Sequence, residues 1–511
     1  MISSYDNSTI NLTSTELSSG WIVSSVLNAA TLSGLVLNNA TMYPRFFVEN
    51  SSYTSVITND FEPITITPFS NDIGAVITIN GTIVESGHTS DRIPLVSGDN
   101  IINVVVTSLR AVTTVYTITI TAITKTQTVT VIYNNGSSVD HVGVVAIDSY
   151  ITGDLPNVNT VLLGPGIYTV NSAAGNVVIS RPITIAASIG RTATIKMINA
   201  PWSGSEPPCV ITCYNGVALK GLVIDANSVN NIVAIHSTYF TDLPVSSRIE
   251  GPEYRCVMMD NGTIDNCHFI NWTTGGAGEV FPIWGYNASF TNCLIDNPVS
   301  VGPAEPYVTV VTGENLQCNN ISIIMPDSWD PWVVWPGTNV LGNKYPKMFG
   351  FTVYNGSTIT NCYVKNCTTL YHNDSFDVNN VNISNNTADH TVQGFASWGH
   401  NNSNVTITGN NFKVSPYMNG TTIGWAGYGI LISTEDNAAL ICTNLKITNN
   451  TINMINTGDL ATPILILTTS TNTFIPEVHN NIITGVTTRG SRFNLSNINV
   501  TGTQGDFLAS L

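Results

Sequence analysis

Acidic, imidazole and aromatic side chains are concentrated between positions 371 and 400, and these residue types could carry out chemistry. In chain order they are Tyr371, His372, Asp374, Asp377, Asp389, His390, Trp398 and His400. Two carboxylates can hydrolyse a glycosidic bond, one as the acid and the other as the base or nucleophile. We therefore take Asp377, Asp389 and His390 as candidate catalytic residues, and Trp398 and His400 as candidate glycan contacts. The alternative interpretation, that these residues only form solvent-exposed polar turns, remains open.

A second concentration of aromatic and acidic residues lies in a long segment that follows Ile324. Its candidate glycan-binding residues are Asp327, Trp329, Asp330, Trp332 and Trp335. Indole rings offer flat apolar faces to sugar rings, while carboxylates accept hydrogen bonds from sugar hydroxyls. The same tryptophans could instead pack this segment onto the rest of the chain, as in an Ω-loop. Binding and packing both remain open.

The scarcity of basic residues bears on which carbohydrate chemistry is open to the chain. Between Arg255 and Lys446 the only other Lys or Arg residues are Lys344, Lys347, Lys365 and Lys413. A lyase needs a basic side chain and a cation to neutralise a uronate, so this scarcity disfavours action on pectin or alginate. Calcium-binding nonapeptide repeats and zinc-type Cys/His spacings are both missing from the sequence. We therefore expect no metal and no cofactor.

The composition excludes two other classes of partner. Lys and Arg number 17 against 33 Asp and Glu, and the formal charge of −16 is opposite to what phosphate neutralisation requires. No apolar run approaches the roughly 18 to 20 residues that a membrane-spanning helix needs. We therefore expect neither nucleic acid nor a membrane span. Charged residues make up only 10% of the chain, so its surface must consist mostly of neutral polar groups.

The location of the protein is inferred from the same surface chemistry. The first 20 residues contain neither a basic segment nor an apolar one, so they do not read as a signal peptide. Asn-x-Ser/Thr sequences are frequent, either because they are glycosylated or because Asn-rich turns precede Thr-rich strands. A surface rich in amides and hydroxyls suits an extracellular protein, a cell-surface protein or a virion protein.

The segment 21–124 alternates apolar and polar residues in short runs separated by turns, which predicts a β-sandwich. Within it, Leu32–Leu37, the Asn80-Gly81 turn, Leu95–Ile101 and Val115–Ile120 resemble the bacterial cadherin-like β-sandwich module. In that family the module is usually a spacer or a binding accessory. We treat residues 1–20 as an N-terminal extension that precedes it.

A recurring unit dominates the chain after residue 125. The unit begins with an apolar residue and a polar residue, continues with Asn or Gly and then Cys or Asn, and ends with a further apolar pair. Its copies begin at Ile264, Phe290, Ile359, Ile383, Ile407, Ile447 and Val478. Repeats of this kind indicate a solenoid with insertions. The pattern resembles the right-handed parallel β-helix proteins of the pectate-lyase-like superfamily. The fold we expect is all-β, with a β-helix over residues 125–505 and functional groups on its outer faces and loops.

The fixed Asn and Cys positions have a physical reason. Stacked coils lie about 4.8 Å apart, so equivalent amides can hydrogen-bond to each other as a ladder, and Asn tolerates left-handed turns. Cys267 and Cys293 occupy the same position in neighbouring repeats. At this spacing they could form a disulfide or an inward row of thiols.

These observations favour two functions. The first is a surface-structural or adhesion protein that contacts glycans through loops on the β-helix flank and forms homo-oligomers, which would protect the solenoid ends. The second is a carbohydrate-active enzyme, a lyase or glycoside hydrolase, that acts on a neutral or weakly charged polysaccharide. The fold alone cannot separate them, because catalytic β-helices share this architecture.

Overall fold

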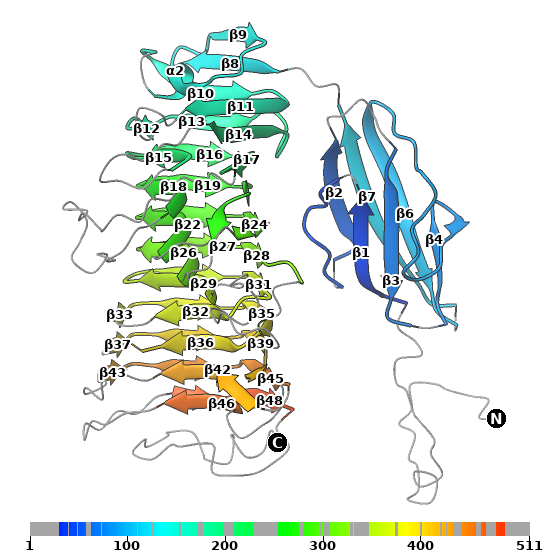
Figure 1. Cartoon of the computed structure of the whole chain (residues 1–511), viewed down its shortest axis with the longest axis vertical. Helices are drawn as coiled ribbons and strands as arrows, with labels where there is room; N and C mark the ends of the chain where they lie inside the picture. The colour runs from blue at the N-terminus through cyan, green and yellow to red at the C-terminus, as the bar shows by residue number, and fades with distance from the viewer. Residues whose placement is uncertain are drawn as a thin grey trace, which may run out of the picture. The chain divides into compact units, whose positions relative to one another are not determined.

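The computed structural model describes residues 30–38, 40–48, 50–57, 63–72, 74–109, 111–123, 127–152, 155–171, 177–198, 209–227, 254–274, 279–296, 298–300, 307–327, 331, 347–373, 377–398, 401–419, 422–425, 427–432, 441–455, 461–466 and 477–485. The chain divides into two compact units, residues 1–125 and 126–511. Both are built from strands, which confirms the predicted all-β class (Figure 1). The predicted extension 1–20 lies outside the described residues.

The N-terminal unit is the expected β-sandwich. One sheet pairs β1 (Leu32–Asn38) with β3 (Thr65–Ser70), and the other has the order β2 (Ser52–Ile57), β7 (Thr113–Ala122), β6 (Gly98–Thr107), β4 (Val76–Ile79) and β5 (Thr82–Ile83). Alternate residues of the longer strands, such as Val104 and Ile118, are fully buried between the two sheets. Asn80 and Gly81 both have positive φ, as a two-residue hairpin turn requires.

The second unit is a parallel β-helix whose coils contribute to three long sheets (Figure 1). The thirteen-stranded sheet has the order β47 (Glu477–His479), β44 (Lys446–Thr448), β38 (Thr406–Thr408), β34 (Asn382–Ser384), β30 (Thr358–Thr360), β27 (Gln317–Asn319), β23 (Ser289–Thr291), β19 (Thr263–Asp265), β16 (Ala218–Lys220), β13 (Thr184–Ala187), β10 (Val158–Leu163), β8 (Thr128–Tyr133) and β9 (Ser138–Val142). Its last two members form an antiparallel hairpin, and with the short helix α2 (Asp148–Ile151) they begin the solenoid.

The other two long sheets are parallel throughout. The eleven-stranded sheet runs β11 (Gly166–Asn171), β14 (Ala193–Ile198), β17 (Leu222–Asp225), β20 (His268–Ile270), β24 (Leu294–Asp296), β28 (Ser322–Ile324), β31 (Tyr363–Lys365), β35 (Thr387–Thr391), β39 (Asn411–Val414), β45 (Thr451–Met454) and β48 (Ile482–Thr484). The ten-stranded sheet runs β12 (Val178–Ile179), β15 (Ile211–Cys213), β18 (Tyr254–Asp260), β22 (Glu279–Tyr286), β26 (Tyr307–Glu314), β29 (Lys347–Tyr354), β32 (Thr369–Asn373), β36 (Gln393–Ser397), β42 (Gly427–Ile432) and β46 (Ala461–Ile466).

Three small sheets complete the described structure. They pair β21 (Thr273–Thr274) with β25 (Val299–Ser300), β33 (Val378–Asn379) with β37 (Asn401–Ser403) and β43 (Ile441–Thr443), and β40 (Tyr417–Asn419) with β41 (Thr422–Trp425). No helix among the described residues is long and apolar enough to cross a membrane.

The corner between the thirteen-stranded and the eleven-stranded sheets explains the sequence repeat. From β19 to β48 two residues make this turn in every described coil, and the first of them has positive φ, as in Asn266, Asn385 and Asn449. Asn and Gly are the residues that adopt this conformation most readily. The second residue of the turn points inward and is buried.

In the last four of these turns the inward residue is Asn, and the amides bond to one another. Asn386 Nδ2 donates to Asn410 Oδ1 at 3.0 Å, and the same bond joins Asn410 to Asn450 and Asn450 to Asn481, each at 2.9 Å. Each Nδ2 also donates to a backbone carbonyl, and each Oδ1 accepts from the backbone N–H of the preceding coil. Every polar atom of the row is therefore satisfied without water.

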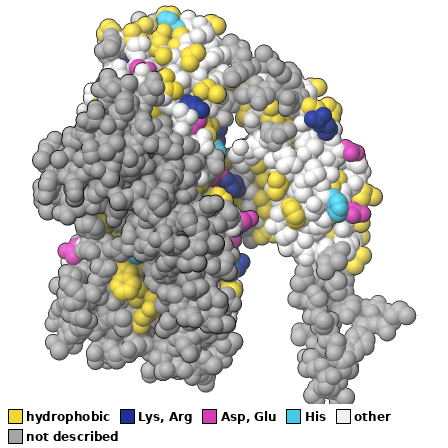
Figure 2. Space-filling view, in the orientation of Figure 1, with side chains coloured by type: hydrophobic (Ala, Val, Ile, Leu, Met, Phe, Trp, Pro, Cys, Tyr) yellow, Lys and Arg dark blue, Asp and Glu magenta, His cyan; other side chains and the backbone are white. Residues whose placement is uncertain are grey.

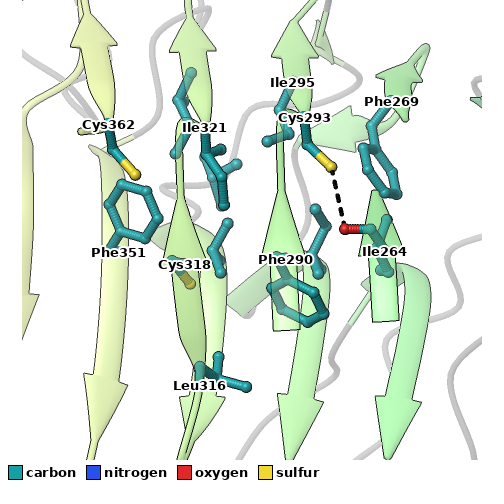
Figure 3. Packing of buried hydrophobic residues seen from close by; sticks show 14 of the residues in the cluster. Ile264, Phe269, Phe290, Cys293, Ile295, Leu316, Cys318, Ile321, Phe351 and Cys362 are labelled. Atoms are coloured by element: carbon teal, nitrogen blue, oxygen red, sulfur yellow. Dashed lines mark hydrogen bonds between the residues drawn. The ribbon is translucent and has the colours of Figure 1, made fainter. Parts of the chain in front are cut away.

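In three of the four earlier turns cysteine takes the inward position, and in the turn between β27 and β28 Ile321 takes it. Cys267, Cys293 and Cys362 are fully buried in the core. Cys362 lies beside Phe351, and Cys293 Sγ lies 3.8 Å from the carbonyl of Ile264 (Figure 3). The seven cysteines whose side chains the structure describes are all free. Of the two alternatives for Cys267 and Cys293, the structure therefore has the row of thiols. Burial raises the pKa of both thiols, that of Cys293 to about 12.

The amide row predicts a strong effect of one substitution. We expect Asn410→Ala to lower the free energy of unfolding by on the order of 3 kcal/mol, because buried partners left unbonded cost roughly 1–3 kcal/mol each. Urea unfolding measures this. The exposed neighbour Asn411 is the matched control, and we expect Asn411→Ala to change stability by no more than about 0.5 kcal/mol. Equal effects of the two substitutions would contradict the role of the row.

The buried thiols predict a labelling pattern. In the native protein at pH 8 we expect iodoacetamide to leave Cys267 and Cys293 unmodified, since both are inaccessible and burial raises the pKa of both. After unfolding in urea both should be alkylated, as peptide mass spectrometry would show. A disulfide-linked peptide containing the two residues would contradict the free row.

Candidate functional site

Three of the predicted site residues come together on the outer face of the eleven-stranded sheet. They are Asp327, Asp389 and His390, and they lie among the consecutive strands β28, β31, β35 and β39. Lys365 is in register with Asp389, and Asp389 is in register with Lys413. Lys365, Asp389 and Lys413 therefore occupy one column of alternating charge, each one coil from the next, and Asp327 joins its end from the turn after β28 through an ion pair with Lys365. We call Asp327, Lys365, Asp389 and Lys413 the charged column.

Asp389 is held from both neighbouring coils. Its Oδ1 lies 3.3 Å from Lys413 Nζ, and its Oδ2 accepts a hydrogen bond from Tyr363 Oη at 3.1 Å. The Asp389 side chain is 30% exposed and that of Lys413 is 47% exposed, so the pair is accessible to a ligand. Exposed ion pairs add little stability, which leaves their polar atoms available for recognition.

Asp327 closes the other end of the charged column. Its Oδ1 accepts from Asn366 Nδ2 at 2.9 Å and lies 3.3 Å from Lys365 Nζ. The hydrogen bond from Asn366 and the charge of Lys365 lower the pKa of the Asp327 carboxyl. A carboxyl that ionises this easily is a hydrogen-bond acceptor and is unsuited to be a general acid.

His390 sits where the strand is irregular. The register between β35 and β39 shifts between Asp389 and Thr391, and His390 has a φ of 59°. This is the β-bulge geometry that often turns a side chain out of the regular ladder. The half-buried imidazole is near enough to Asp327 to contribute to its lowered pKa.

The structure separates the remaining candidates from the charged column. Asp377 is exposed and precedes β33 of the three-stranded sheet, so it is on another face of the coil from Asp389. Trp398 is half-buried after β36, and its backbone N–H bonds to the carbonyl of Asn373. Of the candidate residues that the structure describes, Asp327, Asp389 and His390 therefore come together, and Asp377 and Trp398 do not join them. Trp329, Asp330, Trp332, Trp335 and His400 lie outside the described residues.

Sequence reasoning did not single out the outer face of the ten-stranded sheet. Phe349 and Gln393 each precede a glycine whose Cβ would meet a core side chain, so both residues point away from the core. The ring of Phe349 stacks on that of His372, with centroids 3.8 Å apart. Phe349 and His372 are almost fully buried, although they lie on the outer face of the sheet. The only sequence signal was His372 itself, whose ring partner comes from the preceding coil.

A third polar group, also missed, lies earlier on the eleven-stranded sheet. His268 Nε2 is 2.8 Å from Asp296 Oδ1, and each side chain is 11% exposed. Lys196 Nζ lies 3.7 Å from Asp225 on strands β14 and β17 of the same sheet. Among the described residues, no group of three His, Cys, Asp or Glu side chains could hold a metal ion. These pairs were missed because their members are far apart in sequence.

Comparison with known proteins matches the first unit to a family model and finds solved structures that are similar to the chain. Residues 27–123 match the family model of the cadherin-like beta sandwich domain, which confirms the resemblance seen in the sequence. No curated protein matches the chain in sequence.

Three similar solved structures are β-helix proteins of different origin. They are endo-xylogalacturonan hydrolase from Aspergillus tubingensis (12% identity, 67% of this chain and 91% of the other, TM-score 0.36), a tailspike protein of an E. coli bacteriophage in complex with a pentasaccharide (12%, 70% and 70%, 0.39), and a family 28 exopolygalacturonase from Yersinia enterocolitica (9%, 86% and 96%, 0.35). These TM-scores are all below 0.5, so the similarities carry no information about sites.

The charged column predicts a pKa change. We expect Lys365→Met to raise the pKa of Asp327 toward its ordinary value, because the substitution removes the nearby positive charge. The folded-state pKa is lowered, so the stability that this carboxylate contributes is present at neutral pH and is lost as the pH falls through that pKa.

NMR titration of the labelled Asp327 carboxyl measures this change. Lys413→Met is the control, since Lys413 pairs with Asp389. An unchanged or lower pKa of Asp327 in Lys365→Met would contradict the described contact.

Proposed function

We propose that the protein is an extracellular or virion-surface protein that binds glycans through the outer flank of its β-helix. The observation that carries the proposal is the charged column, where consecutive coils present accessible carboxylates, ammonium groups and a phenol. These groups can both donate and accept hydrogen bonds, as sugar hydroxyls require. The repetition by one coil suits a ligand that is itself an extended chain.

The charge balance of the column supports a neutral or weakly charged glycan. Two lysines and two aspartates neutralise each other in pairs, so the column has no surplus charge for a polyanion. The formal charge of −16 further disfavours a polyanionic ligand. Trp329, Trp332 and Trp335 would add stacking surfaces from the segment after β28, with Asp330, Trp398 and His400 as further contacts.

A structural role at an exterior surface is consistent with the rest of the chain. Charged side chains are few and scattered over the described surface in the view of Figure 2, as the 10% content implies. A surface of amides and hydroxyls stays hydrated without the charges that most soluble proteins carry. The cadherin-like unit at residues 27–123 would serve as a spacer or accessory. Homo-oligomer formation remains part of the proposal.

A glycan-array screen of the purified protein tests the proposal. We expect binding to neutral polysaccharides, and we expect Lys413→Ala to weaken it by on the order of tenfold, since a hydrogen bond to a charged group is worth about 1.5–3 kcal/mol. Lys196→Ala is the matched control, because Lys196 pairs with Asp225 on the same sheet several coils away. Trp332→Ala tests the predicted tryptophan contacts in the same screen.

A product-release assay on the polysaccharides that bind in the array decides between the binder and the enzyme. Release of reducing sugar or unsaturated product from the bound polysaccharides, lost in Asp377→Asn or Asp389→Asn, would establish the enzymatic alternative at the residues that sequence reasoning selected. An array without any bound glycan would refute the proposed function and leave a structural component.

A further inference from the structure

The corner between the thirteen-stranded and eleven-stranded sheets also carries acceptor sequences for N-linked sugars. In successive coils from β27 onward, the first residue of this corner is Asn320, Asn361, Asn385, Gly409, Asn449 and Asn480, each with positive φ. The sequences Asn320-Ile-Ser, Asn385-Asn-Thr and Asn449-Asn-Thr have the form Asn-x-Ser/Thr, and the three others do not. Acceptor sequences therefore occur in every second coil of this corner.

The alternation comes from one column of the eleven-stranded sheet. The third residue of each sequence is the first residue of the next strand, and these strands stack in register. From coil to coil the column reads Ser322, Tyr363, Thr387, Asn411, Thr451 and Ile482. A general preference for Asn in turns and Thr in strands does not explain why Ser or Thr is found in alternate coils only.

The three acceptor asparagines are accessible at this corner. Asn320, Asn385 and Asn449 are all exposed, and the strand residues that complete their sequences are half-buried. Asn320 Nδ2 donates a hydrogen bond to Asn292 Oδ1 at 2.8 Å. An amide nitrogen carries two hydrogens, so Asn320 can keep this bond and still exchange the other hydrogen for a sugar.

Two other acceptor sequences provide a contrast, because their asparagines are buried. Asn366-Cys-Thr has its asparagine 4% exposed, and Asn373-Asp-Ser has its asparagine 0% exposed. Asn366 Nδ2 uses both of its hydrogens, one toward the carbonyl of Met325 at 3.0 Å and one toward Asp327 Oδ1 at 2.9 Å. The structure therefore separates acceptor sequences that an enzyme can reach from those that it cannot.

We propose that Asn320, Asn385 and Asn449 are N-glycosylation sites and that their alternation keeps the attached glycans two coils apart. Neighbouring coils are about 4.8 Å apart, so alternate coils are about 9.6 Å apart. Non-bonded carbon atoms stay about 3.5–4.0 Å from each other, so branched sugar chains that begin on neighbouring coils collide. Chains that begin two coils apart have room.

The opposite corner, which precedes the thirteen-stranded sheet, does not share the alternation. Its acceptor asparagines Asn261 and Asn287 lie on neighbouring coils, since Thr263 is in register with Ser289. The inference is therefore confined to the corner that follows the thirteen-stranded sheet.

The co-reactant of the modification is an oligosaccharide joined through phosphate to a lipid carrier, and the catalyst is an oligosaccharyltransferase of the host. The asparagine Nδ2 attacks the anomeric carbon of the first sugar. The bond from that carbon to the phosphate oxygen breaks, and the lipid phosphate leaves with the electron pair. Nδ2 loses one proton, so one C–N bond replaces one C–O bond and nothing is oxidised or reduced.

Sugars at this corner would supply hydration that charged side chains do not. Charged residues are only 10% of the chain, and N-linked glycans are bulky and solubilising. The inference takes the exterior location from the proposed function, because N-linked sugars are found on exterior proteins. It does not depend on the glycan that the charged column binds.

Peptide mass spectrometry of the full-length protein, purified from its native source, tests the inference. An amidase that releases N-linked sugars in heavy-oxygen water leaves a mass label on each modified asparagine. We expect the label on Asn320, Asn385 and Asn449 to exceed that on Asn366 by about tenfold or more, because burial withholds Asn366 from the transferase.

Substitutions at Thr387 test one site without changing its asparagine. Thr387→Ala, made in the same host, should abolish the label on Asn385 and leave Asn320 and Asn449 labelled, since it removes the hydroxyl that the acceptor sequence requires. Thr387→Ser is the matched control and should keep the label on Asn385.

A new acceptor sequence on the intervening coil tests the spacing. Ile482 is 55% exposed, so Ile482→Thr completes an acceptor sequence at Asn480 with little effect on the fold. One tryptic peptide, residues 447–489, contains both Asn449 and Asn480. We expect this peptide to carry one sugar chain or none in every molecule.

The outcomes distinguish this inference from the proposed function. Absence of the label from all three asparagines overturns the inference and leaves glycan binding in the array, and with it the proposed function, untouched. Labelled asparagines in a protein that binds no glycan support the inference and refute the proposed function. Equal labelling of Asn366 and Asn385 overturns the role of exposure, and two sugar chains on the peptide 447–489 overturn the role of the spacing.

Discussion

The in-register stacking of one coil on the next is the constraint on which the whole solenoid depends. At the corner between the thirteen-stranded and eleven-stranded sheets, each described turn from β19 onward has only two residues, and the second is buried. A polar side chain there must find its partners in the neighbouring coils, and Asn410 does so with all of its amide atoms. A shift of one residue in any coil would bury unbonded amides and expose the core. Register is thus specified by hydrogen bonding as well as by hydrophobic burial.

The same register creates the surface sites. Because equivalent positions of successive coils lie above one another, single outward residues far apart in sequence become neighbours, as Lys365, Asp389 and Lys413 do. The core needs only the inward positions, so the outward ones are free to carry chemistry. A parallel β-helix therefore presents columns of side chains, and each column combines residues from several coils. The charged column arises from this geometry.

The fold could be predicted because its determinants are local and repeated. The Asn or Gly at the turn and the Cys or Asn after it appear in the sequence at nearly every coil, and the structure has positive φ at Asn266, Asn385 and Gly409 as that pattern indicates. Asp327, Asp389 and His390 were recognised as unusual residues, but their lysine partners were not. His268 and Asp296 each look like ordinary strand residues, and only the pairing of β20 with β24 brings their side chains within 2.8 Å. Insertions of different length between coils conceal that pairing in the sequence.

The two-residue corner also limits how the chain can diversify. From β19 onward no described coil has an extra residue between the thirteen-stranded and eleven-stranded sheets. The connections that follow the eleven-stranded sheet vary much more in length. One residue separates β35 from β36, and more than twenty separate β28 from β29. An insertion at the corner would interrupt the buried row of Asn386, Asn410, Asn450 and Asn481, while an insertion after the eleven-stranded sheet lies outside it. Sequence length can therefore vary on one side of the solenoid without disturbing the other. A relative with altered ligand preference should differ from this chain mainly in those connections, with the corner kept residue for residue.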